Sequence, residues 1–297
     1  MELIKYLPQG MKYLKNEPMS RHTTFRTGGV ADLILLPSSY EELSLVLKLL
    51  AARGEKPTVI GNGSNLLVSD KGIRGTVIKI CEQFSWTEVS GETIECGAGT
   101  YLAKLCNVAA ENSLSGAESL FGIPGTVGGA VYMNAGAYGS ETKDILRKVT
   151  YMEPDGSISE LAGTAGYGYR CSPFTGTEKI VLSASFAFSI GEKSAIEEKM
   201  RDVKNRRTEK QPINLPSAGS AFKRPEGHFA AALIEQAGLK GFTVGGAQVS
   251  EKHAGFIVNI NKATTTDILR LIDVIKGKVY NDFGVILEPE VKFIGEK

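Results

Sequence analysis

Histidine is scarce in this 297-residue chain, which has only three, at positions 22, 228 and 253. A serine hydrolase needs a histidine base beside its serine, so this scarcity argues against a Ser-His-Asp triad. Cysteine is sparse too: the four residues form no C-x-x-C pair and have no histidine neighbour at metal-ligand spacing. We therefore predict no metal site, and buried thiols in a reducing compartment rather than a disulfide framework.

The chain also lacks an excess of charge and a membrane segment. Its 34 Lys+Arg and 33 Asp+Glu give a formal net charge of +1, without the surplus positive charge that general nucleic-acid binding requires. Residues Met1–Pro8 have no apolar signal core. The long uncharged stretch Ser119–Ser140 holds six glycines and Pro124, which argues against a membrane helix. We predict a cytoplasmic protein with no membrane insertion, no nucleic-acid partner and no obligatory protein partner.

What the sequence does contain is an alternation of helix and strand signals, typical of an α+β protein. Apolar residues at helical spacing predict helices over 41–53, 101–112, 193–207, 229–237 and 264–282. Runs rich in β-branched residues predict strands at 58–60, 76–80, 93–96, 148–152, 157–161, 179–189, 256–258 and 285–287. Thr264 and Asp267 form a capping-box variant at the start of the last helix. The highly charged helix 193–207 is typical of a solvated linker between domains.

Glycine, with 34 residues, is abundant and concentrated in a few segments. The first is Gly61-Asn62-Gly63-Ser64-Asn65, directly after the predicted strand 58–60. Glycines at a strand exit let backbone N–H groups converge on an anion, and Ser and Asn add donors for phosphate oxygens. The segment is neither a Walker A loop nor a full dinucleotide fingerprint, because Leu66 stands where the third glycine would be. A tight turn capped by asparagine is the alternative.

The second glycine segment runs from Phe121 to Gly139 and includes Ile123, Gly125, Thr126, Gly128 and Gly129. So many glycines are costly to order, and a ligand that the backbone must approach closely explains that cost. Crowded packing of a strand on a helix is the alternative. Two such segments in one chain indicate one pyrophosphate-containing ligand held from both sides.

Three further segments carry candidate chemistry. In Tyr167–Phe174, Arg170 lies between aromatics as either a stacked structural guanidinium or an anion clamp. In Ala218–Pro225, a Gly-Ser pair holds a hydroxyl on a constrained loop before two cations, although an ordinary turn serine has the same appearance. Glu288-Pro289-Glu290 places carboxylates near the chain end, where such groups are usually solvated.

Together these five segments, in this order, resemble the UDP-N-acetylenolpyruvoylglucosamine reductase family, flavoenzymes that complete UDP-N-acetylmuramic acid for peptidoglycan. The similarity runs from Thr23-Thr24-Phe25-Arg26 to Glu290-Val291, most of the chain. It implies an α+β protein with an FAD-binding fold of the vanillyl-alcohol-oxidase/PCMH type, made of two α+β subdomains, and a C-terminal α+β substrate domain. The boundaries expected are 1–80 and 81–205 for the subdomains and 206–297 for the substrate domain. The short chain has no room for an extra tyrosine loop, so it resembles the compact, second type of the family.

The resemblance also implies the site. FAD is expected to bind non-covalently, because the first glycine loop has no histidine, and NADPH is expected as co-substrate. The residues expected to bind FAD are Arg26, Gly61, Asn62, Gly63, Ser64, Asn65, Ile123, Gly125, Thr126, Gly128 and Gly129. The catalytic residues expected are Arg170, Ser220 and Glu290. The residues expected to bind the substrate are Arg207, Lys210, Lys223 and Arg224. Arg224 departs from the family pattern, in which an asparagine after this lysine meets the diphosphate of the substrate.

The expected reaction has two halves. NADPH reduces FAD, and the flavin then delivers hydride to C2 of the enolpyruvyl ether of UDP-N-acetylglucosamine, while Ser220 protonates C3. Arg170 and Glu290 are expected to stabilise the charge that develops. Two alternatives remain open: an FAD oxidase of the same fold acting on another alcohol or sugar, and a non-catalytic protein that binds a UDP-sugar or nucleotide.

Overall fold

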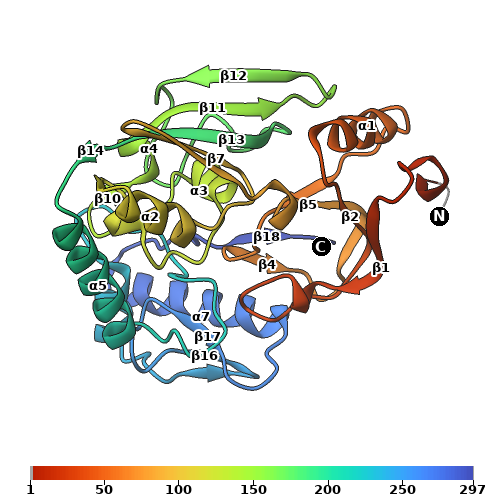
Figure 1. The fold of residues 1–297 in the computed structure, drawn as a ribbon. Coiled ribbons are helices and arrows are strands. Elements are labelled where there is room, and N and C mark those ends of the chain that lie inside the picture. The colour runs from red at the N-terminus through yellow and green to blue at the C-terminus, as the bar shows by residue number, and fades with distance from the viewer. Residues whose placement is uncertain (1–2, 297) are drawn as a thin grey trace. The chain divides into compact units, whose positions relative to one another are not determined.

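The structure is a computed structural model that describes residues 3–296 (Figure 1). Packing divides the chain into two compact units. The first unit comprises the residues up to Leu14, Leu33–Asn62 and Gly75–Asn205, and the second comprises Lys15–Asp32, Gly63–Arg74 and the residues from Arg206 on. The division falls within the charged helix predicted to be a linker. The predicted three domains, with boundaries at 80 and 205, stay a prediction.

The first unit contains a five-stranded antiparallel sheet of order β12-β11-β13-β7-β6. Its strands are β6 Thr87–Ser90, β7 Thr93–Gly97, β11 Leu146–Met152, β12 Ile158–Ala162 and β13 Ile180–Ala187. Two short pairs accompany it, β9 Gly136–Ala137 with β10 Ser140–Glu141 and β8 Leu114–Ser115 with β14 Ser189–Ile190. The strand predicted over 179–189 is therefore divided between β13 and β14.

A second sheet, of order β1-β2-β5-β3, contains strands through which the chain passes from one unit to the other. Its strands are β1 Lys12–Pro18, β2 Val30–Leu36, β3 Thr58–Ile60 and β5 Ile73–Lys79. β3 pairs in parallel with β5, from Thr58 opposite Val77 to Ile60 opposite Lys79. The first glycine loop begins where β3 ends, as the sequence predicted.

The helices of the first unit bury one apolar face each. They are α1 Tyr40–Ala51, α2 Leu102–Glu111, α3 Val127–Met133, α4 Thr142–Ile145 and most of α5 Lys193–Lys210. α1 begins where Ser39 accepts a hydrogen bond from the Glu42 amide, and its buried face contains Leu43, Val46 and Leu50, as predicted. α2 and α3 contact β7, and α3 also contacts β13 (Figure 1). This packing fixes the second glycine segment, which leads into α3.

The second unit is smaller and has its own core around α7 Thr265–Phe283. A three-stranded antiparallel sheet contains β15 Thr243–Val244, β16 Ala247–Val249 and β17 Ile257–Asn259, and a parallel pair joins β4 Leu66–Val68 to β18 Lys292–Ile294. α6 Ala230–Gln236 contacts α7. The capping box predicted at Thr264 and Asp267 is confirmed, with both reciprocal hydrogen bonds present. Four short 3-10 turns complete the fold: η1 Leu3–Tyr6, η2 Met19–Arg21, η3 Glu82–Phe84 and η4 Glu118–Leu120.

The strand predicted at 285–287 is wrong. Gly284 ends α7 in the left-handed conformation, and the chain then runs without a ladder until a single bridge pairs Pro289 with Phe222. Ile286 is 71% exposed, so the apolar run is not the buried strand that its composition indicated. Proline has no N–H to continue a ladder, and regular pairing resumes only in β18.

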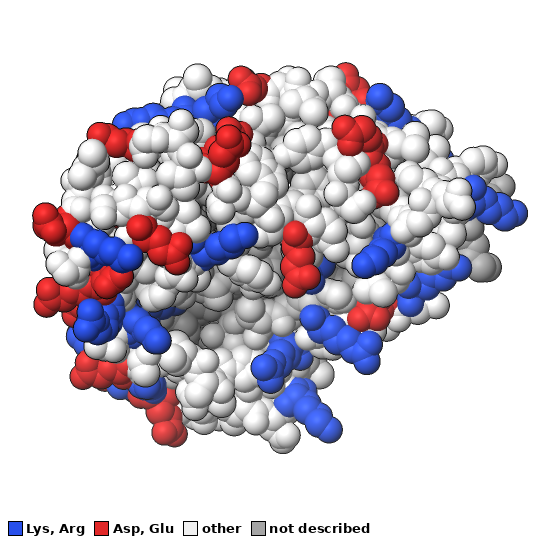
Figure 2. Space-filling model, viewed as in Figure 1, with Lys and Arg blue, Asp and Glu red and all other residues white. Residues whose placement is uncertain are grey.

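Charged side chains of both signs are interspersed over the face of the molecule that Figure 2 shows. Among residues 3–296, no helix is both long enough and apolar enough to cross a membrane.

Candidate functional site

In the first unit, the two glycine segments lie against each other. The Asn62 side chain donates a hydrogen bond to the Pro124 carbonyl oxygen at 2.7 Å, and the Tyr101 hydroxyl donates to Asn62 Oδ1 at 3.3 Å. A Cβ atom at Gly61 would lie 2.8 Å from Thr126 Oγ1, which is closer than real Cβ contacts allow. The structure thus brings together two of the segments predicted to hold one ligand, and a side chain at position 61 would require the Thr126 side chain to shift.

Two main-chain amides at the start of α3 donate hydrogen bonds to main-chain carbonyl oxygens of the protein. The Val127 amide donates to the Thr100 carbonyl oxygen at 2.7 Å, and the Gly128 amide donates to that of Ala98 at 2.8 Å. A Cβ atom at Gly128 would lie 3.0 Å from the Ala98 Cβ. Close packing therefore accounts for this glycine, as the alternative interpretation had it. Contacts of Ile123, Gly125, Gly128 and Gly129 with FAD stay a prediction.

The rest of the first glycine loop lies in the second unit. Gly63 has φ +68°, and a Cβ atom there would lie 2.0 Å from the His22 carbonyl oxygen. The Thr24 amide donates to the Gly63 carbonyl oxygen at 3.3 Å, and the Thr24 hydroxyl donates to that of Ser64 at 3.4 Å. Arg26, on the same Thr-rich segment, has a φ of 55° and is exposed. The loop and the segment carrying Arg26 are thus held together, as a shared role in binding requires.

Ser220 and Glu290 are connected through Ala221, the residue that directly follows Ser220. The Glu290 amide donates to the Ala221 carbonyl oxygen at 2.8 Å, and the Ala221 amide donates to that of Gly255 at 2.8 Å. Ser220 bridges Phe256 in antiparallel fashion and is itself exposed, while Ala221 is buried. Ser220 is therefore exposed on a loop whose next residue is anchored in the core, and its role as a proton donor stays a prediction.

Arg170 lies in the first unit with φ 54°, a conformation that is uncommon for a non-glycine residue. Its Nη2 donates to the Gly136 carbonyl oxygen at 3.0 Å, and its guanidinium lies 4.9 Å from the centre of the Tyr169 ring. Of the two interpretations left open by the sequence, the stacked guanidinium is present. A role as an anion clamp stays a prediction.

Asn134 is a supporting residue that the sequence prediction missed. It is fully buried at the end of α3, and its backbone has the left-handed conformation, with φ 44°. Its Nδ2 donates to Gly168 O at 2.8 Å and to Glu141 Oε2 at 3.0 Å, and its Oδ1 accepts from the Lys143 amide at 3.0 Å. Asparagine is one of the few residues that accept this backbone conformation, so a predicted helix end followed by Asn was the available signal.

The turn that carries Arg170 also contains an unsatisfied group. The Tyr167 hydroxyl is buried and has no hydrogen-bond partner among the described residues, and burial raises its pKa. Buried polar groups nearly always have a partner, so this hydroxyl calls for one outside the polypeptide, either a ligand or water.

The four cations predicted to bind the substrate lie in the second unit. Lys223 Nζ is 2.8 Å from Glu288 Oε2, and this ion pair lowers the pKa of Glu288. The Arg224 guanidinium lies 4.0 Å from the centre of the exposed Phe229 ring, a cation–π contact. Arg207 and Lys210 occupy the last turn of α5. The two cations after the serine therefore have identified partners within the protein.

The prediction that the cysteines are buried thiols is only partly correct. All four are free, and burial raises the pKa of Cys96 and of Cys106 to about 12, as expected for inert buried thiols. Cys171, however, is exposed and Cys81 is half-buried, because they lie in a turn and at a strand exit. In residues 3–296, no group of three or more His, Cys, Asp or Glu side chains is placed to hold a metal.

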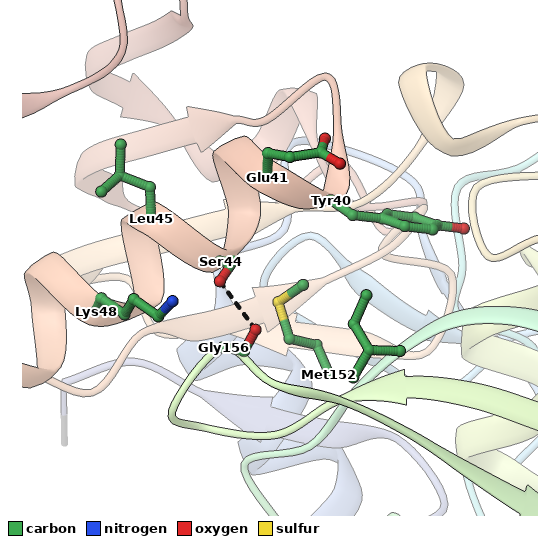
Figure 3. Close-up of a pocket in the computed structure, with 8 residues that line it drawn as sticks. Tyr40, Glu41, Ser44, Leu45, Lys48, Met152 and Gly156 are labelled. Atoms are coloured by element: carbon green, nitrogen blue, oxygen red, sulfur yellow. Dashed lines mark hydrogen bonds between the residues drawn. The ribbon is translucent and has the colours of Figure 1, made fainter.

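A shallow groove of about 370 Å³ lies elsewhere in the first unit (Figure 3). Its walls are α1 and the β11–β12 hairpin, joined where the Ser44 hydroxyl donates to the Gly156 carbonyl oxygen at 2.8 Å. The lining is mainly apolar, including Leu45, Met152 and Ile158. None of the residues predicted to bind a cofactor or substrate lines this groove, so it is separate from the candidate site.

Comparison with known proteins now defines the class. The profile of the FAD binding domain matches residues 31–162. The C-terminal domain profile of UDP-N-acetylenolpyruvoylglucosamine reductase matches residues 211–294. A structure of a single-residue variant of berberine bridge enzyme covers 64% of this chain and 44% of its own, with a TM-score of 0.50 and 15% identity, which bears on the fold alone. The chain is a flavoprotein with the predicted FAD-binding fold and a separate C-terminal α+β domain.

Full-length relatives narrow the class to one family. The UDP-N-acetylenolpyruvoylglucosamine reductase of Alkaliphilus oremlandii is 47% identical over 99% of this chain and 97% of its own. That of Caldanaerobacter subterraneus is also 47% identical, over 100% of this chain and 98% of its own. The crystal structure of the Thermus caldophilus reductase covers 95% of this chain and 98% of its own at 35% identity, with a TM-score of 0.80. The chain belongs to the UDP-N-acetylenolpyruvoylglucosamine reductase family.

Proposed function

We propose that the chain is the NADPH-dependent reductase that converts the enolpyruvyl ether of UDP-N-acetylglucosamine to UDP-N-acetylmuramate in peptidoglycan synthesis. The observation that carries this function is the match of 47% identity over 99–100% of the chain to reductases of that name. The match spans both the FAD-binding and the C-terminal domain. As part of the same proposal, residues 1–80 and 81–205 form the FAD-binding subdomains, and residues 206–297 form the substrate domain.

The two glycine segments have the features needed to hold FAD. Gly63 has no space for a side chain, a side chain at position 61 would displace Thr126, and Asn62 links the first segment to the second. Gly61–Asn65 and Ile123–Gly129 are the proposed FAD contacts, Asn65 through its main chain because its side chain bonds Glu290, with Arg26 as a cation for a phosphate. The first loop has no histidine, so the cofactor is held without a covalent bond. When bound, FAD would accept a hydride from NADPH and supply one to C3 of the enolpyruvyl group rather than to C2 as expected above, because only addition at C3 leaves the negative charge on C2, where the adjacent carboxylate stabilises it as an enolate.

Ser220 is the proposed proton donor to C2, the carbon that is left basic when the hydride adds to C3. A serine hydroxyl is a weak acid near neutral pH, so it donates usefully only to a strongly basic carbon such as the enolate that hydride addition creates. Its exposure on a loop anchored by Ala221 supports this role. No imidazole base is required, since the serine acts as an acid and not as a nucleophile.

Arg170 and Glu290 are the proposed partners of the charge that develops on the enolpyruvyl carboxylate and C2. A fixed guanidinium supplies positive charge without reorganising, and the hydrogen bond from Arg170 to Gly136 holds it in one orientation. Glu290 is proposed to act on the same charge through a hydrogen bond, because a bare carboxylate would repel the enolate.

Lys223, Arg224, Arg207 and Lys210 are the proposed contacts of the substrate diphosphate. Lys223 already pairs with Glu288, so binding the diphosphate exchanges one anionic partner for another. Solvent screens such an exposed ion pair, so this exchange is a small cost. The Arg224 guanidinium lies over the ring of Phe229.

Visible spectroscopy under anaerobic conditions tests the function. The purified protein should be yellow, lose its flavin absorbance on addition of NADPH, and regain it on addition of the enolpyruvyl substrate with formation of UDP-N-acetylmuramate. Reoxidation by oxygen alone, with no turnover of the enolpyruvyl substrate, would identify an oxidase of the same fold. A colourless protein that binds UDP-sugar would identify a binding protein.

We also propose that the enzyme acts in the cytoplasm, with NADPH and the UDP-linked substrate as its partners. The four free cysteines support a reducing compartment.

A further inference from the structure

The main chain of Glu290 is held from both sides within the second unit. Its amide donates to the Ala221 carbonyl oxygen at 2.8 Å, and its carbonyl oxygen accepts from Asn65 Nδ2 at 3.3 Å. Asn65 is the last residue of the first glycine loop, 225 positions away in the sequence. We propose that Asn65 is a positioning residue for the carboxyl group of Glu290, a role that rests on the proposed function.

The contact extends a regular strand pair. β4 and β18 run in parallel, with Leu66 opposite Lys292. The Lys292 amide donates to the Asn65 carbonyl oxygen at 2.9 Å, at the end of the pair nearer to Pro289. Beyond this point the Glu290 amide bonds to Ala221 instead of β4. The Asn65 side chain adds one bond beyond the end of the pair, and that bond reaches Glu290.

These hydrogen bonds connect the two residues proposed to act on C2 and the carboxylate, Ser220 and Glu290. Ala221, which accepts from Glu290, directly follows Ser220, and its own amide bonds to Gly255. Fixing the Glu290 peptide from both sides sets the starting point of its side chain relative to the serine loop. Misplacing a catalytic group by about 1 Å costs about a hundredfold in rate, so such positioning has a measurable effect.

A positioning role makes a different prediction from a direct role in binding FAD. Loss of an FAD contact weakens cofactor affinity and affects both half-reactions. Loss of the Asn65–Glu290 hydrogen bond should leave reduction by NADPH intact and slow only the reoxidation of the flavin by the enolpyruvyl substrate. Asn62 provides the matched control, because it is an asparagine of the same loop whose amide bonds to Pro124 in the other glycine segment.

Anaerobic stopped-flow spectroscopy on FAD-saturated protein separates the two half-reactions. For Asn65→Ala, and for the isosteric Asn65→Asp, which has no amide donor, we expect reduction by NADPH within about twofold of wild type. We expect reoxidation by the enolpyruvyl substrate to be slower by about tenfold to a hundredfold. Asn62→Ala should instead weaken FAD affinity. An equal loss in both half-reactions of the Asn65 variants would overturn the positioning role.

Two measurements complete the test. In a Glu290→Gln background, Asn65→Ala should slow reoxidation by less than about threefold, because there is no carboxyl group left to position. Hydrogen exchange of apo-protein peptides covering residues 288–292 should be faster in Asn65→Ala than in wild type. Full additivity of the two substitutions, or unchanged exchange, refutes the inference. Wild-type protein that is never reoxidised by the enolpyruvyl substrate refutes the proposed function instead.

Discussion

The side chain of Asn134 donates a hydrogen bond to the main-chain carbonyl oxygen of Gly168 at 2.8 Å, and so ties the end of α3 to the turn that carries Arg170. The same side chain bonds Glu141 and the Lys143 amide. One buried amide therefore connects three segments of the first unit. The backbone of Asn134 is left-handed, a conformation that asparagine adopts more readily than most residues, so this position suits asparagine both by its side-chain bonds and by its backbone.

Replacing Asn134 with alanine should be costly. The change leaves buried polar groups unpaired and places alanine at a positive φ, so we expect the free energy of unfolding to fall by about 2–3 kcal/mol. Urea unfolding measures this loss. Asn112→Ala is the control, because the side chain of that exposed asparagine donates to the Val108 carbonyl oxygen of its own helix. Equal effects of the two substitutions would contradict the linking role.

Gly63→Ala tests the close packing of the first glycine loop. The new Cβ would lie 2.0 Å from the His22 carbonyl oxygen, at a φ of +68°. We expect a loss of at least about 2 kcal/mol in the free energy of unfolding and a higher dissociation constant for FAD.

Gly139→Ala is the matched control for that substitution. Its φ is +87°, and nothing lies within 4 Å of the added Cβ, so it reports the conformational cost alone, about 1 kcal/mol. A Gly63→Ala protein as stable as Gly139→Ala would show that the loop shifts without difficulty.

Local signals in the sequence predicted much of the fold. The capping box at Thr264 and the apolar spacing after it placed α7 to within a residue at each end, because both signals act between residues a few positions apart. The strand predicted at 285–287 failed for the opposite reason. An apolar run indicates burial and a partner strand, and the partner is decided by distant parts of the chain.

The candidate site likewise has a part that the sequence predicted and a part that it could not predict. Glycine content located the segments that contact each other near Gly61 and Thr126, since only a few residue types permit such close approach. The links that hold the site are non-local and have no sequence signature. Asn65 reaches Glu290 across 225 positions, and Asn134 reaches Gly168 across 34. Such contacts become visible only when the fold is known.

Ser220→Ala should separate the two half-reactions. Reduction of the flavin by NADPH does not need the hydroxyl, so its rate should stay within about twofold of wild type. Product formation should fall by about a hundredfold to ten-thousandfold, the usual contribution of a positioned acid. Stopped-flow absorbance and product analysis measure both. Ser217→Ala, three residues earlier on the same loop, should change neither rate, and an equal fall of both rates in Ser220→Ala would exclude the proton-donor role.

His253 should make the stability of the second unit depend on pH. Its Nδ1 accepts from the Gly255 amide at 3.2 Å and its ring packs edge-on against Phe256, at 5.0 Å between ring centres. Burial lowers the pKa of His253 below its ordinary value, and Lys240 lowers it further, while the His253 backbone and Glu235 act in the opposite direction. The neutral imidazole is therefore the form that the folded protein favours.

The sign of the effect follows from proton binding. The pKa of His253 is lower in the folded protein than in the unfolded chain, where it is about 6.5. The contribution of His253 to stability is therefore fully present above about pH 6.5, and it is lost as the pH falls from there through the pKa of the folded protein. Urea unfolding of wild type and His253→Gln between pH 8 and pH 5 isolates this contribution, because the other groups titrate in both proteins. We expect wild type to lose more stability than the variant as the pH falls. A difference between the two proteins that is constant with pH, or that moves in favour of wild type at low pH, would show that His253 is not held neutral by its surroundings.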